Sequence, residues 1–128
     1  MSAIRILHVD DEPDIREVVD ISLALNPDFE VRGCASGAEA VAAAAEWWPY
    51  LILLDVMMPE MDGPTTLSHL RQNPKTSAIP VIFMTARAQA REVEQLIALG
   101  AQGVISKPFD PMTLASQVQS HLRGLHQT

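Results

Sequence analysis

The sequence predicts a single α/β domain built around a parallel β-sheet. Short apolar segments alternate along the 128 residues with longer amphipathic patterns, which is typical of strands joined by helical crossovers. Residues 51–54 (Leu-Ile-Leu-Leu) are apolar at every position and too few for a typical helix, as expected of a central strand covered on both faces. The expected strands are residues 3–9, 29–34, 51–54, 80–85 and 103–106, each followed by a helix.

The length and composition fit one domain spanning residues 1–128. With 48% hydrophobic residues the chain can bury one core, but it is too short for two ordinary domains. The formal net charge of -7, with only 9 Lys and Arg residues, disfavours direct nucleic-acid binding, because phosphate contacts need clustered cations. The single cysteine, Cys34, excludes an internal disulfide and a structural zinc cage.

The N-terminus and the hydropathy pattern predict a cytoplasmic protein with no membrane insertion. The chain passes from Met1-Ser2 directly into the first strand pattern, without a signal peptide. No apolar run approaches the ~18 residues that cross a bilayer. We expect no further domain after the last helix, so the chain is either a stand-alone domain or a fragment of a larger protein.

The first helix is expected to begin at Pro13, which suits a first helical turn, and to end before Asn26-Pro27. Its apolar residues recur at three- and four-residue steps and should face the sheet: Ile15, Val18, Ile21 and Leu25, widened by Val19.

The later helices have equally clear signals. Ser36 and Glu39 form a capping-box pattern that starts the second helix, which should end near Trp48-Pro49. The third runs from Pro64 to Asn73-Pro74. The last two are expected at residues 88–99, with Val93, Leu96 and Ile97 on one side, and 111–122, with Leu114, Val118 and Leu122 inward.

Polar side chains follow four of the expected strands. Asp10-Asp11 follow the first strand, Asp55 the third, Thr85 the fourth and Lys107 the fifth. Because the carboxyl ends of parallel strands share one edge, these groups should lie together, where open α/β sheets bind ligands. Close carboxylates repel, so either one binds a proton or a cation compensates them; hard oxygen ligands favour Mg²⁺. A carboxylate beside a metal, a hydroxyl and an ammonium has the parts needed for phosphoryl transfer, with Asp55 as nucleophile.

Four motifs in this order resemble the response-regulator receiver domain of two-component signalling, in its single-domain, chemotaxis-like form. They are Val-Asp-Asp-Glu-Pro at 9–13, Leu-Leu-Asp-Val-Met-Met-Pro-Glu-Met-Asp-Gly at 53–63, Thr-Ala at 85–86 and Gly-Val-Ile-Ser-Lys-Pro-Phe at 103–109. The resemblance covers essentially the whole chain. It implies a doubly wound, flavodoxin-like sheet of five strands in the order 2-1-3-4-5 with five helices.

The same resemblance implies a phosphorylation-dependent switch in which Asp55 accepts a phosphoryl group from a sensor histidine kinase or a phosphotransfer protein. Asp10, Asp11, Asp55 and the backbone carbonyl of Met57 would hold Mg²⁺. Such a domain catalyses only its own phosphorylation and dephosphorylation, so it is not a turnover enzyme. It acts on an output partner that the sequence does not identify.

The resemblance also assigns the remaining site residues. Thr85 and Lys107 would each contact a phosphoryl oxygen, and the Lys107-Pro108 peptide bond would be cis. In the family an aromatic residue often occupies the position of Val104 and moves inward with the threonine. Since valine has no comparable rotamer change, we expect the signal to depend on the backbone from Thr85 and Ala86 to Ala88 and on the following helix. Residues at the positions of Met57 and Arg87 tune hydrolysis in the family.

Two alternatives remain open. A Mg²⁺-dependent phosphohydrolase with an aspartyl intermediate usually needs an acid two residues after the nucleophile, where this chain has Met57. A constitutive docking module would have lost a site residue, and none is lost. Among other residues, His8 is expected at a strand edge, and His69, His121 and His126 in solvent. Of Trp47 and Trp48, one should pack and the other be exposed.

Overall fold

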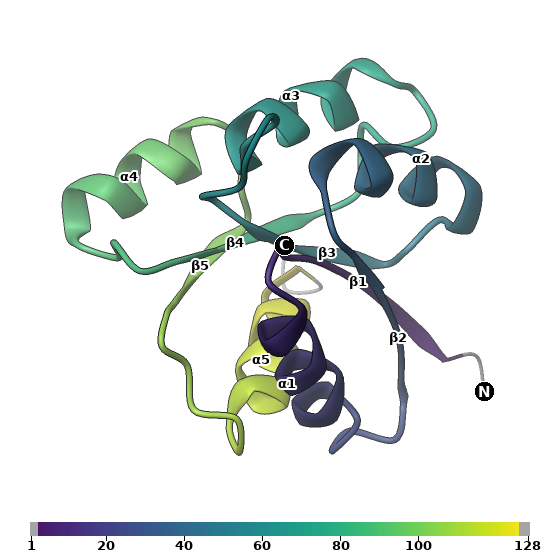
Figure 1. Ribbon diagram of the computed structural model, residues 1–128, viewed down its shortest axis with the longest axis vertical. Coiled ribbons are helices and arrows are strands. Elements are labelled where there is room, and N and C mark those ends of the chain that lie inside the picture. Colours follow the sequence, from purple (N-terminus) through teal and green to yellow (C-terminus); the bar gives the residue numbers. More distant parts are fainter. Residues whose placement is uncertain (1–2, 126–128) are drawn as a thin grey trace.

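The computed structural model describes residues 3–125, which form a five-stranded parallel sheet with helices on both faces (Figure 1). The elements are β1 Ile4–Val9, α1 Pro13–Leu23, β2 Phe29–Cys34, α2 Gly37–Trp47, β3 Leu51–Asp55, α3 Gly63–Gln72, β4 Val81–Thr85, α4 Ala90–Ala98, β5 Gly103–Ser106 and α5 Leu114–Leu125. The strand order is β2-β1-β3-β4-β5, with β3 in the centre. The predicted fold class and strand order are therefore confirmed.

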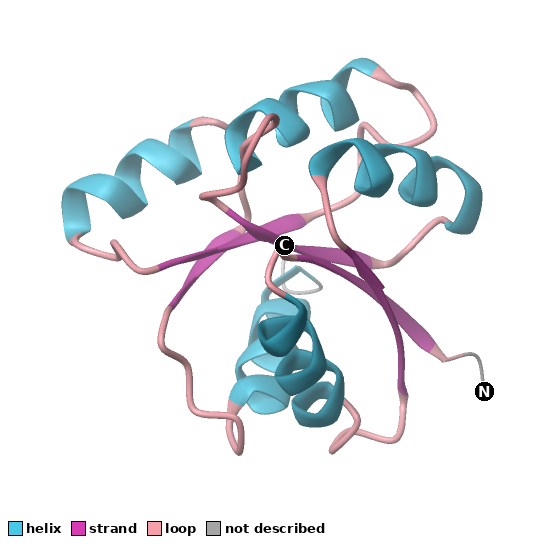
Figure 2. Ribbon diagram, in the orientation of Figure 1, coloured by secondary structure: helices cyan, strands magenta, loops and turns pink. Residues whose placement is uncertain are grey.

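The helices form two layers, one on each side of the sheet. Figure 2 shows α1 and α5 together on one face and α2, α3 and α4 on the other. Alternate residues of each inner strand enter the two cores, because side chains in a strand point to opposite faces. Thus Ile6 packs with Val19 and Leu23 of α1, while Leu7 packs on the side of α2 and α3. All five residues of β3 are buried, as its uninterrupted apolar sequence predicts.

Side chains cap the starts of two helices: the Ser36 cap was expected from the sequence, and the Asp62 cap was not. The Ser36 hydroxyl accepts a hydrogen bond from the Glu39 amide at 3.1 Å, and a Glu39 carboxylate oxygen accepts one from the Ala35 amide at 3.2 Å. At α3, Asp62 Oδ1 accepts a hydrogen bond from the Thr65 amide at 2.9 Å. The Asp62 cap fixes the end of the loop that follows Asp55.

The buried face of α1 differs from the expected stripe. Val19, Ser22 and Leu23 are buried, whereas Val18, Ile21 and Leu25 are exposed, Ile21 by 64%. Ile15, at the start of the helix, is partly buried against the same core. Both stripes have helical spacing, so periodicity could not choose between them. The buried stripe includes Ser22, and hydropathy alone would predict that this polar residue is exposed.

Two helices begin later than expected because polar side chains organise the preceding loops. Asp110 Oδ1 accepts a hydrogen bond from the Met112 amide at 2.9 Å, and residues 111–113 form turns before α5 begins at Leu114. The Thr85 hydroxyl likewise accepts a hydrogen bond from the Arg87 amide at 3.0 Å, and α4 begins at Ala90. The inward positions expected of α5, Leu114, Val118 and Leu122, are confirmed.

Two of the histidine expectations were wrong. His8 is 1% exposed, in a strand that lies between β2 and β3, and its Nε2 is 2.6 Å from Asp20 Oδ1 of α1. His121 is half-buried, and its ring occupies the space that a Cβ on Gly103 would need. His69 is exposed, as expected, and His126 lies outside the described residues. Trp47 is partly buried and Trp48 is 65% exposed, which confirms the expected division.

Within residues 3–125, no helix is long and apolar enough to cross a membrane.

Candidate functional site at the carboxyl edge of the sheet

Three carboxylates meet where β1 and β3 end. Asp10, Asp11 and Asp55 each offer one oxygen, and these oxygens lie within 4.8 Å of one another. Asp10 and Asp55 are buried and Asp11 is partly exposed. The parallel register of β1 and β3 produces this cluster, because Val9 lies beside Leu54 and both strands therefore end at the same level.

Lys107 joins the cluster from the end of β5. Its ammonium donates hydrogen bonds to Asp10 Oδ2 at 2.8 Å and to Asp55 Oδ1 at 3.1 Å, and its side chain is 18% exposed. The three carboxylates therefore have one ammonium among them, which bonds to Asp10 and Asp55. The remaining negative charge is chemically suited to a hard divalent cation such as Mg²⁺, which prefers carboxylate and carbonyl oxygens.

Burial and charge both affect ionisation in the cluster. Burial raises the pKa of Asp55 above its ordinary value, and the charges of Asp10 and Asp11 raise it further, while the hydrogen bond and charge of Lys107 act in the opposite direction. Burial acts to lower the pKa of Lys107, but its hydrogen bonds to Asp10 and Asp55 and their charges outweigh burial, so that pKa is raised. Lys107 therefore remains a cation at neutral pH.

The loop between Asp55 and α3 depends on a close approach at Gly63. The Gly63 amide donates a hydrogen bond to the Val56 carbonyl at 2.9 Å. A Cβ at Gly63 would lie 2.6 Å from the Asp55 carbonyl oxygen and 2.9 Å from the Val56 Cα. Since both are backbone atoms, only glycine fits. Within this loop the Met57 side chain is 77% exposed.

Thr85 is buried at the end of β4, the strand next to β3, and directly follows Met84, which pairs with Asp55. Its hydroxyl accepts the hydrogen bond from the Arg87 amide, and the next residue, Ala86, is exposed. Val104, in the neighbouring strand β5, is partly buried and packs against the core on the side of α3 and α4. The Lys107-Pro108 peptide bond is cis, the isomer that the resemblance implies.

Sequence reasoning missed Arg16 and the backbone of Glu12. The Glu12 amide donates to Asp10 Oδ1 at 2.9 Å, and Arg16 Nη1 donates to the Asp10 carbonyl oxygen at 2.7 Å. The sequence offers one signal for Arg16: it lies one helical turn after Glu12, on a helix that starts beside the site.

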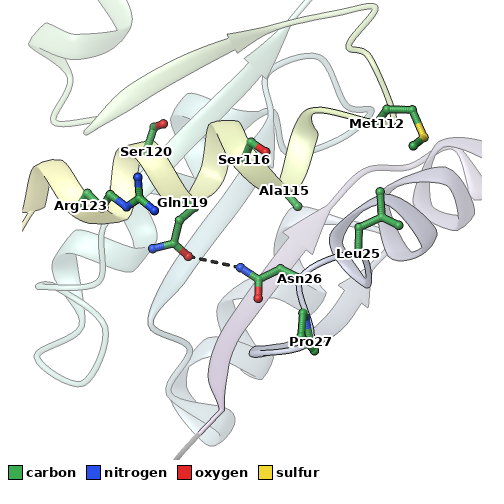
Figure 3. Close-up of a pocket in the computed structure, with 9 residues that line it drawn as sticks. All are labelled: Leu25, Asn26, Pro27, Met112, Ala115, Ser116, Gln119, Ser120 and Arg123. Atoms are coloured by element: carbon green, nitrogen blue, oxygen red, sulfur yellow. Dashed lines mark hydrogen bonds between the residues drawn. The ribbon is translucent and has the colours of Figure 1, made fainter.

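A separate hollow of about 410 Å³ lies between the end of α1 and α5 (Figure 3). Leu25, Asn26 and Pro27 line it on one side and residues of α5 on the other, with Asn26 Nδ2 3.3 Å from Gln119 Oε1. None of the residues expected at the phosphoryl site lines this hollow.

Comparison with known proteins identifies relatives of the whole domain. A family model described as the response regulator receiver domain matches residues 6–119. RpaA of Synechocystis sp., a DNA-binding dual master transcriptional regulator, is 36% identical over 119 residues, covering 93% of this chain and 49% of that protein. PhoB of Escherichia coli, a phosphate regulon transcriptional regulatory protein, is 37% identical over 121 residues, covering 94% and 52%. This chain thus spans about half the length of these curated relatives.

Solved structures give the same result for the fold. The chemotaxis protein CheY4 of Vibrio cholerae has a TM-score of 0.84 and 31% identity, covering 93% of this chain and 98% of that one. A response regulator from Desulfuromonas acetoxidans has a TM-score of 0.82 and 31% identity, covering 94% and 98%.

Proposed function

This chain belongs to the family of response regulator receiver domains, and we propose that Asp55 is the residue whose phosphorylation switches it. The observation that carries the proposal is the cluster of Asp10, Asp11, Asp55 and Lys107 at one edge of the sheet. The cluster combines buried carboxylates, excess negative charge and one ammonium. This combination is expected of a site that accepts a phosphoryl group and is not expected of an ordinary acidic loop.

In the proposed transfer, a carboxylate oxygen of Asp55 attacks the phosphorus of a phosphohistidine. The new O–P bond forms as the P–N bond breaks, and the imidazole leaves with the electron pair of that bond. Lys107 would exchange part of its present contact with Asp55 for a phosphoryl oxygen, and the Thr85 hydroxyl would donate a hydrogen bond to another. Both groups would stabilise charge on the transferred group.

The residues that would hold Mg²⁺ are Asp10, Asp11, Asp55 and the backbone carbonyl of Met57. When bound, the ion would neutralise charge on the phosphoryl oxygens. Three carboxylate oxygens within 4.8 Å support this assignment, because they provide hard ligands whose mutual repulsion a divalent cation would relieve.

Phosphorylation would change the partner surface through the loop after β4. Reorientation of the Thr85 hydroxyl towards a phosphoryl group would break its hydrogen bond with the Arg87 amide and so alter the backbone around Ala86 before α4. Val104 would contribute no large rotamer change. We propose that the output surface lies on α4, β5 and α5, where Ile97 of α4 and Leu99 at its end are already exposed.

The partners we propose are a sensor histidine kinase or phosphotransfer protein as donor, and a separate or attached output module. The phosphohydrolase alternative is not favoured, because Met57 supplies no acid or base two residues after Asp55. The docking-module alternative is not favoured either, since every group that the chemistry requires is present.

The test is the intact mass of the protein after incubation with acetyl phosphate or phosphoramidate, with Mg²⁺ or with excess EDTA. We expect one added phosphoryl group in the presence of Mg²⁺, no addition in EDTA, and no addition to Asp55→Asn. Asp62→Asn is the matched control, because it removes an acid from the same loop while an amide can still cap α3. Phosphorylation of Asp55→Asn to the wild-type level would overturn the assignment.

A further inference from the structure

Asp10 is the most constrained carboxylate of the cluster. Its amide donates to the Cys34 carbonyl at 3.1 Å, its Oδ1 accepts from the Glu12 amide and its Oδ2 accepts from Lys107. The fourth contact is the 2.7 Å hydrogen bond from Arg16 Nη1 to the Asp10 carbonyl oxygen. Two of these contacts are made by side chains. Lys107 bonds to the carboxylates themselves, whereas Arg16 bonds to the Asp10 backbone.

Arg16 is built into the junction between α1 and the sheet. Its amide bonds to the Glu12 carbonyl at 3.0 Å within the first turn of α1, and its side chain is half-buried. A Cβ on Gly33 of the edge strand β2 would lie 3.8 Å from Arg16 Cδ. The guanidinium therefore reaches across the end of the sheet to the peptide that carries the Asp10 carboxylate.

We propose that Arg16 is a positioning residue that sets the affinity of the acidic cluster for Mg²⁺ by fixing the Asp10 peptide. The proposal rests on the proposed function, because it concerns the same cation site. Arg16 would not contact the metal or the phosphoryl group. It would act as an outer-shell partner, and loss of such a partner typically weakens metal binding about 10- to 100-fold.

The sign of the effect separates positioning from simple electrostatics. A guanidinium near a cation site repels the cation, so electrostatics alone predicts that removing Arg16 strengthens Mg²⁺ binding. Positioning predicts the opposite, because the freed Asp10 peptide no longer holds its carboxylate towards Asp11 and Asp55. Whether Arg16→Met binds Mg²⁺ more tightly or more weakly than wild type therefore distinguishes the two effects.

The experiment is a MgCl₂ titration of ¹⁵N-labelled protein, without any phosphoryl donor, following the amide resonances of residues 10–12. The wild type, Arg16→Met and the control Arg91→Met are compared. Arg91 is an exposed residue of α4, and its replacement changes the net charge by the same amount as that of Arg16. The same spectra report whether each variant is folded.

We expect wild type and Arg91→Met to bind with equal affinity and Arg16→Met to bind about 10-fold more weakly. Equal or tighter binding by Arg16→Met overturns the proposal while leaving the magnesium site intact. Absence of binding by the wild type overturns the metal assignment itself, and this inference with it. If Arg16→Met does not fold, Arg16→Ala takes its place, with Arg91→Ala as its control: weaker binding than the control supports positioning, and equal or tighter binding refutes it.

Discussion

Replacing Gly63 by alanine tests the packing that holds Asp55 in place. The added Cβ would lie 2.6 Å from the Asp55 carbonyl oxygen, 2.9 Å from the Val56 Cα and 3.0 Å from Phe83 Cε1. Overpacking costs about 1–3 kcal/mol, and the upper half of this range applies because two of the three atoms belong to the backbone. Alanine at a helical position recovers less than about 1 kcal/mol. We expect a net loss of about 2 kcal/mol.

The assay is urea denaturation followed by tryptophan fluorescence. Gly124→Ala is the matched control, because a Cβ there meets no described atom within 4 Å and the residue is helical. The control should retain or slightly exceed wild-type stability. A Gly63→Ala variant within about 0.5 kcal/mol of wild type would refute the argument that backbone crowding requires glycine at this position.

Three further predictions use isolated features of the structure. Asp62→Ala removes the α3 cap and should cost about 1 kcal/mol in the same assay, whereas Asp62→Asn should stay close to wild type; equal losses would contradict capping. Burial raises the pKa of Cys34 to about 11, so its thiol should react with a disulfide reagent only after unfolding, and rapid reaction of the folded protein would contradict this. Burial lowers the pKa of His121 below 6.5, so the unfolded chain binds its proton first as pH falls. The contribution of His121 to stability should therefore decrease as pH falls through about 6.5, so the stability of wild type relative to His121→Gln should decrease over the same range; an unchanged difference would contradict this burial effect.

Much of the site could be predicted because it depends on topology more than on side-chain detail. In a parallel sheet the carboxyl ends of neighbouring strands lie at one edge whatever the loops do. The positions of Asp10, Asp55 and Lys107 at strand ends were therefore sufficient to predict that they meet. The apolar run 51–54 similarly predicted a central strand, since only a strand covered on both faces tolerates it.

The orientation of α1 could not be predicted in the same way. A helix with apolar residues on more than one side has several stripes with acceptable spacing, and contact with the sheet decides among them. Here the sheet buries Val19 and Leu23 with Ser22 between them, and Ile21 remains exposed. Packing of the whole core, rather than local pattern, determines this choice.

The hydrogen-bond partners of the polar side chains Arg16 and His8 could not be predicted from the sequence either. Arg16 bonds to a backbone carbonyl, which has no residue-type signal in the sequence. His8 bonds to Asp20 across the interface between β1 and α1, and this pairing depends on how the helix is placed. Such contacts follow from tertiary structure: spacing places Arg16 one helical turn after Glu12, but it does not show that the side chain reaches the Asp10 carbonyl oxygen.

The most direct test of the account is to locate the phosphoryl group within the chain. Sodium borohydride reduces an acyl phosphate to an alcohol, so treatment of the phosphorylated protein converts the modified aspartate into homoserine, which peptide mass spectrometry can locate. We predict homoserine at position 55 only, and only after phosphorylation in the presence of Mg²⁺. Homoserine at position 10 or 11, or none at position 55 in protein that carries the phosphoryl mass, would contradict the central claim.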